Sequence, residues 1–168
     1  MTFRVEPLHD GHDLERFDCG IASLNDWLRL HARHATRQGT RTYLLIDDDT
    51  HEIAGYFSIA PHLIERHELP PRVGRGAPRR IPAILLAKLA LQRTHHGHGL
   101  GGELLIRALE TVVTAARTAG GKIAVVDAID DNASRFYQHH DFEPLTSDPH
   151  RLVQKLSTIA AALDLPWP

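Results

Sequence analysis

A short glycine-rich segment in the middle of the chain has the residue types and spacing to bind a phosphate group. The segment consists of His96, Gly97, His98, Gly99, Leu100, Gly101 and Gly102. Glycines let backbone N–H groups approach a phosphate closely, and the N-terminus of a following helix adds partial positive charge. The segment therefore predicts a site for a phosphate-bearing cofactor. The alternative is a tight turn that holds no ligand.

Two regular elements are expected to position this segment. The apolar run from Ile84 to Leu91 predicts a buried strand directly before it. A helix is expected from Leu100 to about Ala119, where two glycines stop it. Its apolar residues recur at helical spacing and are Leu104, Leu105, Ala108, Leu109, Val112 and Val113.

Two common phosphate-binding patterns fit this segment poorly. The Walker pattern needs Gly-Lys followed by Ser or Thr, and that triplet is absent from the sequence. Gly97, Gly99 and Gly102 formally satisfy the dinucleotide pattern G-x-G-x-x-G. That pattern also needs an acid about twenty residues further on, and Asp127 comes too late.

Arginines mark two further stretches of the chain. Arg29, Arg33 and Arg37 are four residues apart on a helix predicted between Ser23, in a capping box, and Gly39. The stripe is either a solvated face or a phosphate-contact surface, because guanidinium groups bind phosphate well. The segment 66–82 is rich in Pro, Gly and Arg, and it predicts a loop that is either functional or disordered.

The other elements predict one mixed α/β sandwich over residues 1–168, without internal repeats. Strands are expected at 2–7, 43–46, 53–60 and 122–128, with a hairpin turn at 47–50. A short helix capped by Asp130 or Asp131 follows, and it carries Phe136 and Tyr137. A last hairpin uses Phe142 and residues 152–155, and Ser157 is expected to cap a final helical turn.

Composition limits the remaining possibilities. The 168 residues are 42% hydrophobic, enough for a single core, and the net charge of −2 gives no overall attraction to nucleic acid. The single Cys19 excludes an internal disulfide. No apolar run is long enough to span a membrane, so we expect a soluble, cytoplasmic protein. His95, His96 and His98 have a spacing that would allow a metal ion, but they lie in the predicted phosphate loop, so no metal is predicted.

The chain resembles the GNAT superfamily of acetyltransferases over nearly its whole length. The segment 96–101 is similar to that superfamily's acetyl-CoA loop, Q/R-x-x-G-x-G/A. The resemblance is strongest to the GNAT toxins of bacterial toxin–antitoxin pairs. The pieces that carry it are Phe17-Asp18-Cys19-Gly20, Leu24-Asn25-Asp26-Trp27-Leu28, Arg41-Thr42-Tyr43, Ile53-Ala54-Gly55-Tyr56-Phe57, Arg80-Ile81-Pro82, the strand Leu85–Leu91, Val126-Asp127-Ala128 and Phe136-Tyr137.

The resemblance implies the GNAT fold, a central, mostly antiparallel mixed sheet with splayed fourth and fifth strands and helices on both faces. It implies acetyl-CoA as co-substrate, with Tyr137 protonating the departing thiolate. A backbone N–H at the strand splay would contact the thioester oxygen. Beside the residues of the glycine segment, the implied cofactor-binding residues are Leu89, Ala90, Leu91, Asn132, Ala133 and Phe136. The expected tRNA-binding residues are Arg33, Arg37, Arg79, Arg80 and Lys88.

The function implied is acetylation of the amino group of aminoacyl-tRNA, which blocks translation. The implied partners are a small DNA-binding antitoxin and a second copy of the chain. Two alternatives stay open: acetylation of a small amine or protein N-terminus, and a weakly active CoA-binding module that acts through an antitoxin. The sequence departs from the usual pattern at His96, where Gln or Arg is common, at Asp130, where Asn is common, and at Asp141, where Gly is common.

Overall fold

The computed structural model describes residues 2–168, and the chain divides into two compact units. The first unit combines the chain up to Ala60 with Ala87–Ala108, and the second combines Pro61–Leu86 with Leu109–Pro168. The expectation of one domain over 1–168 stays a prediction.

The first unit is built on four strands in the order β1-β2-β3-β4. They are β1 (Phe3–Pro7), β2 (Arg41–Asp47), β3 (Ile53–Glu65) up to Ala60, and β4 (Arg80–Leu91) from Ala87. The β1–β2 and β2–β3 pairs are antiparallel. The predicted turn at 47–50 is confirmed, because the Asp47 carboxylate accepts hydrogen bonds from the N–H groups of Asp49 and Thr50.

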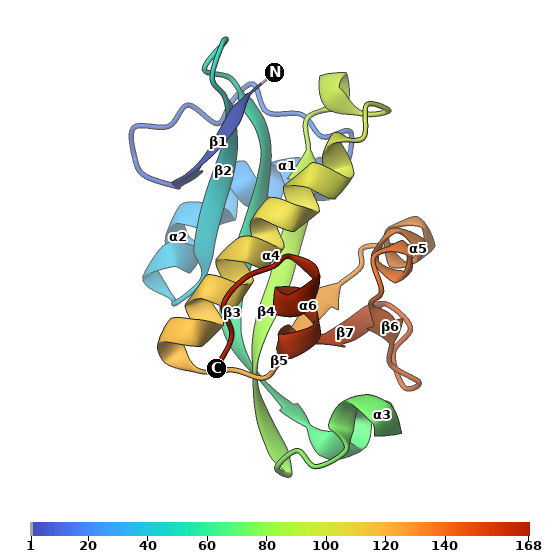
Figure 1. The fold of residues 1–168 in the computed structure, drawn as a ribbon. Helices are drawn as coiled ribbons and strands as arrows, with labels where there is room; N and C mark the ends of the chain where they lie inside the picture. The colour runs from blue at the N-terminus through green and yellow to red at the C-terminus, as the bar shows by residue number, and fades with distance from the viewer. Residues whose placement is uncertain (1) are drawn as a thin grey trace. The chain divides into compact units, whose positions relative to one another are not determined.

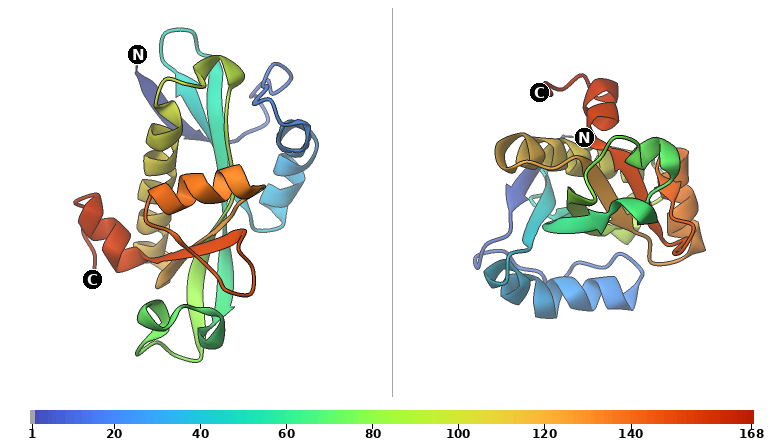
Figure 2. Two further views of the ribbon diagram at one scale, coloured as in Figure 1. Left: turned by 90° about the vertical axis from the view of Figure 1, so that its right-hand side faces the viewer. Right: turned by 90° about the horizontal axis from the view of Figure 1, so that it is seen from below.

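Helices cover both faces of the strands in the first unit. The segment from Ala22 to Arg37 lies on one face, and the beginning of α4 (Leu100–Ala119) lies on the other (Figure 2). The first segment comprises α1 (Ala22–Asp26), the π-helical turn η1 (Trp27–His31) and α2 (Ala32–Arg37). The predicted helix between Ser23 and Gly39 is therefore confirmed in extent, with a π-helical turn inside it.

The predicted capping box at Ser23 is wrong. The residue before α1 is Ile21, and no side chain caps the helix. Asn25, inside the predicted box, instead accepts a hydrogen bond from the Cys19 N–H at 2.8 Å and donates one to Asp18 at 2.9 Å. Hydrogen bonds to residues outside the helix thus replace the local cap, and they tie the helix to the segment before it.

The core of the first unit lies between these helices and the strands. Tyr56 is fully buried, stacks on Trp27 with ring centroids 6.1 Å apart, and donates a hydrogen bond to the Leu24 carbonyl at 2.7 Å. Burial raises the pKa of the Tyr56 hydroxyl. The core cluster also contains Leu14, Phe17, Cys19, Leu28, Ala32, Leu44, Ile46 and Ala90.

The second unit contains strands in the order β3-β4-β5-β7-β6. Besides the remaining parts of β3 and β4 it has β5 (Ile123–Asp127), β6 (Glu143–Pro144) and β7 (Arg151–Lys155). The β4–β5 pair is parallel and runs from Ala83 opposite Ile123 to Leu86 opposite Val126. The β5–β7 and β6–β7 pairs are antiparallel.

Helix α5 (Asp131–His139) lies beside β6 and β7 (Figure 1), and α6 (Leu156–Ala162) follows β7 directly. The predicted Ser157 cap is wrong, because no side chain caps α6. Segment 66–82 is also more regular than predicted. It contains the 3-10 turn η2 (Arg66–Glu68), the short helix α3 (Pro71–Gly74) and the start of β4.

These units confirm the predicted class, a mixed α/β fold with a mostly antiparallel sheet. The helix predicted from Leu100 to Ala119 is confirmed at both ends. Within residues 2–168, no helix combines the length and the apolar character needed to cross a membrane.

Candidate functional site

The glycine segment of the first unit links β4 to α4 through the 3-10 turn η3 (Arg93–His95). Gly97 and Gly99 have φ angles of +80° and +75°, which side-chain-bearing residues rarely adopt. A Cβ built on either glycine meets no atom within 4 Å. The predicted arrangement of strand, glycine loop and helix is confirmed, and the space beside these two backbones is open.

The histidines of this loop have structural contacts of their own. The His96 ring places Nε2 2.8 Å from the Leu91 carbonyl oxygen, so Nε2 donates the hydrogen bond. The His95 ring meets the Phe3 ring edge-on at 5.9 Å, and His98 is exposed. His96 therefore braces the loop against the end of β4, in place of the Gln or Arg usual there.

The end of β4 is fixed within the first unit by a close approach of backbones. Of the predicted cofactor residues there, Ala90 is buried, and Leu89 and Leu91 are half-buried. A Cβ on Gly55 would lie 3.0 Å from the Ala90 carbonyl oxygen and 3.2 Å from Leu104 of α4. The absence of a side chain at Gly55 thus lets β3, β4 and α4 meet closely.

A network centred on Asp18 holds the chain just before the glycine loop. The Asp18 N–H donates to Gln92 at 2.9 Å, the Arg93 N–H donates to the Asp18 carbonyl at 2.8 Å, and the Arg93 guanidinium lies 3.3 Å from the carboxylate. The Gly20 N–H, then Asn25 and Arg93, lower the pKa of Asp18. The sequence analysis does not predict this positioning role. The motif Phe17–Gly20 contains Asp18, but in the sequence it indicates only the family resemblance.

Helix α5 of the second unit carries the predicted site residues that follow β5 in the chain. Asp130 caps the helix by accepting a hydrogen bond from the Ala133 N–H at 2.8 Å, as predicted. Asn132 is exposed, and Ala133 and Phe136 are half-buried. Asp141 adopts a left-handed φ of 70°, so it performs the backbone role of the usual glycine.

Tyr137 on α5 is a buried residue whose hydroxyl has no hydrogen-bond partner within residues 2–168. The side chain is 4% exposed, and its ring meets Phe136 at 5.4 Å and Phe142 at 5.9 Å. Burial, and to a lesser degree the charge of Asp127, raise the pKa of the hydroxyl, so it is protonated at neutral pH. Within residues 2–168 the hydroxyl makes no hydrogen bond, and it is therefore free to donate one.

The basic residues predicted to bind tRNA differ in availability. In the first unit, Arg33 donates to the His12 carbonyl at 2.6 Å, and the Lys88 ammonium lies 5.5 Å from the centre of the Trp27 ring. Arg37 is exposed. In the second unit, Arg79 is exposed and Arg80 lies 3.2 Å from Glu65. Arg37 and Arg79 are thus the freest of the five, and Arg33 is committed to the loop before α1.

One cluster within residues 2–168 brings metal-type ligand atoms together, outside the predicted site. The ligand atoms of Glu6, His9 and His12 lie within 4.8 Å of one another. The Nδ1 atoms of His9 and His12 accept hydrogen bonds from the backbone N–H groups of Gly11 and His9, and His12 Nε2 lies 2.7 Å from Glu6. Because Nδ1 of each histidine accepts a hydrogen bond, each neutral ring carries its proton on Nε2. The nitrogen atoms that could bind a metal are therefore already occupied by hydrogen bonds within the cluster.

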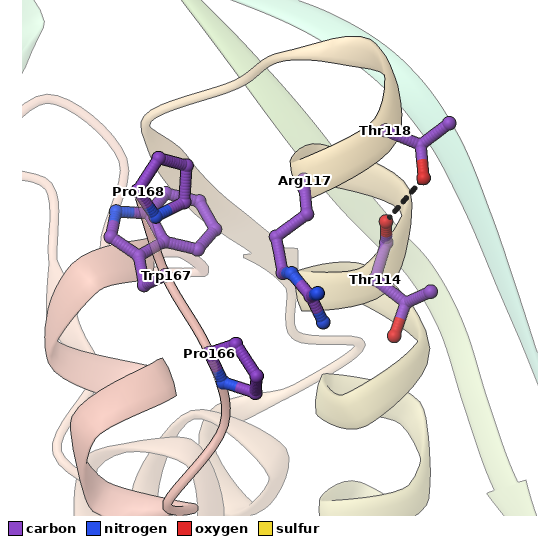
Figure 3. Close-up of a pocket in the computed structure, with 6 residues that line it drawn as sticks. All are labelled: Thr114, Arg117, Thr118, Pro166, Trp167 and Pro168. Atoms are coloured by element: carbon purple, nitrogen blue, oxygen red, sulfur yellow. Dashed lines mark hydrogen bonds between the residues drawn. The ribbon is translucent and has the colours of Figure 1, made fainter.

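A cavity of about 470 Å³ lies in the second unit, between the end of α4 and the last residues of the chain (Figure 3). Inside it the Thr118 hydroxyl donates to the Thr114 carbonyl at 3.1 Å. It contains no residue predicted to bind cofactor or tRNA. Its lining residues are Thr114, Arg117, Thr118, Pro166, Trp167 and Pro168.

A strand, an open glycine loop and a long helix, in a mostly antiparallel sheet with a buried tyrosine on a later helix, are the features of the GNAT class of acetyltransferases. Comparison with known proteins refines this class. The chain is 35% identical to a tRNA-acetylating toxin of Mycobacterium tuberculosis, over 87% of both chains. It belongs to the family of GNAT-type tRNA-acetylating toxins. No protein-family profile matches the chain.

Other relatives agree with this assignment. A probable toxin TacT of Sinorhizobium fredii is 28% identical and covers 95% of this chain and 94% of its own. The solved structure of AtaT complexed with acetyl-methionyl-tRNAfMet superposes with a TM-score of 0.85 at 28% identity, over 96% of this chain and 99% of that one. A mutant of KacT gives a TM-score of 0.86 at 26% identity, over the same shares. The predicted family and GNAT fold are therefore confirmed.

Proposed function

We propose that this protein is a toxin that transfers the acetyl group of acetyl-CoA to the amino group of an aminoacyl-tRNA and thereby inhibits translation. The observation that carries the proposal is the open glycine loop before α4 in a chain of this family. Its relatives include a tRNA-acetylating toxin, and similar solved structures include AtaTR with acetyl-CoA and AtaT with acetyl-methionyl-tRNAfMet.

The glycine loop is proposed to bind the pyrophosphate of acetyl-CoA. The open space beside Gly97 and Gly99, together with the N-terminus of α4, supports this role, because backbone N–H groups can approach an anion there. The ring of His96 is bound to the Leu91 carbonyl. We therefore assign pyrophosphate binding to the backbone of residues 97–102 and a bracing role to His96.

Tyr137 is proposed as the general acid. As the amine attacks the thioester carbonyl, an N–C bond forms and the C–S bond breaks. The developing thiolate then takes the hydroxyl proton of Tyr137. A hydroxyl that is protonated and unpaired within residues 2–168 supports this role. The α-amino group of an amino-acid ester is present in both its ammonium and its neutral form near pH 7, because an α-amino pKa of about 8 is lowered further by the ester. No strong base on the enzyme is therefore needed.

Contacts to tRNA phosphates are proposed first for Arg37 and Arg79, because both side chains are exposed. Arg80 is proposed as a further contact, although its guanidinium already pairs with Glu65. Arg33 and Lys88 have structural contacts in the first unit and are weaker candidates. The cofactor contacts of Leu89–Leu91, Asn132, Ala133 and Phe136 stay predictions.

The antitoxin partner, the homodimer and the cytoplasmic location are part of the same proposal. A mutant of the AtaT toxin has been solved with the C-terminus of the antitoxin AtaR, and a KacTA–DNA complex has also been solved. A small DNA-binding antitoxin is the corresponding partner proposed here.

The test is incubation of the purified protein with labelled acetyl-CoA and total charged tRNA. We expect the label on RNA, released by mild base as an N-acetyl amino acid. Tyr137→Phe should lower kcat about 10²- to 10⁴-fold and leave acetyl-CoA affinity unchanged. Tyr43→Phe is the matched control, because Tyr43 stacks on Phe57 in the first unit and should retain full activity.

Two outcomes would contradict the proposed reaction, and a third would contradict only the proposed role of Tyr137. Label on a polyamine or a protein N-terminus, with none on RNA, would indicate the small-amine alternative. Calorimetry that detects no binding of acetyl-CoA would exclude the enzyme altogether. Normal transfer by Tyr137→Phe would remove Tyr137 as the acid without changing the substrate assignment.

A further inference from the structure

Three polar side chains of the second unit form a connected cluster that the proposed roles above do not use. Asp127 is the last residue of β5, and it lies opposite Arg151, the first residue of β7. Arg151 Nε lies 2.8 Å from Oδ1 of Asp127, and its NH2 group lies 3.1 Å from Oδ2. The remaining NH1 group lies 3.3 Å from Nε2 of His62 on β3. All three guanidinium nitrogens of Arg151 are therefore engaged.

The cluster fixes a carboxylate without covering it. A two-point contact with a guanidinium holds both oxygens of Asp127 in one orientation. Each oxygen accepts one hydrogen bond from Arg151 and keeps a further lone pair. The Asp127 side chain is 40% exposed and that of Arg151 is 30% exposed. Asp127 also lies one residue beyond the parallel register, which ends at Leu86 opposite Val126. Its free lone pairs are thus accessible to a donor from outside the chain.

His62 completes the cluster as a neutral group. Burial, followed by the charge of Arg151, lowers the pKa of His62. Because an arginine nitrogen can only donate, Nε2 of His62 is the acceptor, and the ring proton resides on Nδ1. The histidine therefore orients Arg151 without adding positive charge that would compete for Asp127.

The position of Asp127 connects it with the reaction. Its negative charge acts on the hydroxyl of Tyr137, the proposed acid in the same unit. A fixed, accessible carboxylate whose charge contributes to the raised pKa of the proposed acid is suited to accept hydrogen bonds from an amine, which is the group that the reaction consumes.

We propose that Asp127 binds the acceptor's amino group, and that Arg151, itself held by His62, positions the Asp127 carboxylate for this contact. This inference rests on the proposed function and names the residue that selects an amine. An incoming ammonium donates to Asp127 and loses one proton to solvent. The neutral amine then attacks the thioester. The thiolate takes the Tyr137 proton, and the second proton lost by nitrogen returns to the tyrosinate through solvent.

The test measures binding in the absence of acetyl-CoA, so that no turnover occurs. The ligands are an aminoacyl-tRNA and the same tRNA in which the α-amino group has been converted to a hydroxyl group. Wild-type protein should bind the amine form at least about tenfold more tightly, as expected for a charge-assisted hydrogen bond. Asp127→Asn should bind both forms equally and retain wild-type affinity for acetyl-CoA.

Two further variants keep the test decisive. Glu143→Gln is the matched control, because Glu143 pairs with Arg72 in the same unit and should leave the preference intact. Arg151→Lys keeps the positive charge but loses the two-point contact. It should raise the acceptor KM with little change in the KM for acetyl-CoA, and it replaces Asp127→Asn if that variant fails to fold.

Failure of this inference can be distinguished from failure of the proposed function. If wild-type protein acetylates charged tRNA but binds both ligands equally, the role of Asp127 is refuted and the function stands. If wild-type protein acetylates a different amine, the function is refuted. In that case the role of Asp127 is tested with that amine and its hydroxyl analogue, and an unchanged preference in Asp127→Asn refutes it.

Discussion

Gly55 of β3 approaches Ala90 of β4 so closely that a Cβ on Gly55 would lie 3.0 Å from the Ala90 carbonyl oxygen. That oxygen belongs to the backbone, and the Leu104 side chain at 3.2 Å is buried in the core, so neither neighbour can move away freely. We predict that Gly55→Ala lowers the free energy of unfolding by about 1–3 kcal/mol through overpacking.

Urea denaturation measures this cost. Gly11→Ala is the matched control, because the atoms nearest to its new Cβ belong to the exposed His9 side chain, and a shift of that ring disturbs only one solvent-exposed hydrogen bond. It should change stability by less than about 0.5 kcal/mol. Equal costs for the two variants would show that the approach of β3 to β4 is not tight.

Asp18 should make stability depend on acidic pH. Hydrogen bonds from the Gly20 N–H and from Asn25, and the nearby Arg93, lower its pKa in the folded state. The stabilisation by its carboxylate is therefore complete above the unfolded-state pKa of about 4 and is lost as pH falls through the lower, folded-state pKa. Asp18→Asn removes this dependence.

Denaturation at pH 7 and at several values below pH 4 measures the effect. The stability difference between wild type and Asp18→Asn should shrink as the pH falls. Asp49→Asn, in the β2–β3 turn, serves as control. A difference that stays constant down to pH 2 would mean that the Asp18 carboxylate has no special partners.

The Asp130 cap of α5 should contribute measurably to the free energy of unfolding. Asp130 accepts the hydrogen bond of the Ala133 N–H at 2.8 Å, and Ala cannot. We predict that Asp130→Ala costs about 1 kcal/mol and speeds amide exchange in the first turn of α5. Asp130→Asn retains an acceptor oxygen and should cost much less. Equal losses in the two variants would assign the effect to charge instead of to the cap.

Arg33 and Arg37 should separate structural from tRNA-binding roles on one helix. Arg37 is exposed, so Arg37→Ala should leave stability unchanged and reduce the salt dependence of tRNA binding by about one phosphate contact. Arg33 donates to the His12 carbonyl at 2.6 Å, so Arg33→Ala should lower stability. The measurements are tRNA affinity at several salt concentrations and thermal unfolding. A reduced salt slope in Arg33→Ala at unchanged stability would reverse the two roles.

Local patterns in the sequence predicted several elements of the fold. The helix from Leu100 to Ala119 and the Asp130 cap depend on residues within a few positions of one another, and each is confirmed. The capping box at Ser23 failed although it is equally local. Asn25 in that motif binds Cys19 and Asp18 instead, and such competition is not visible in a short window of sequence.

Contacts between distant residues were beyond the reach of these patterns. Asp18 is more than seventy residues away from Gln92 and Arg93 in the chain, and only the fold brings them into contact. The pairing of Asp127 with Arg151 depends on the β5–β7 register, and a shift by one residue would turn either side chain to the opposite face. Arg33 was predicted to share one helix face with Arg37, either as a solvated residue or as a phosphate contact, but it donates to the His9 and His12 carbonyls of the loop before α1.

The π-helical turn at Trp27–His31 makes this helix unusually sensitive to a change in chain length. A π turn contains more residues than an α turn, so one extra residue is already accommodated within Trp27–His31, and deleting one would restore a regular α turn. Inserting a further residue there would turn α2 by about 100° around the helix axis. Arg33 would leave the His12 carbonyl and Arg37 would face a new direction. In this segment the length of the chain, as much as the identity of its residues, decides which cations the protein presents to its surroundings.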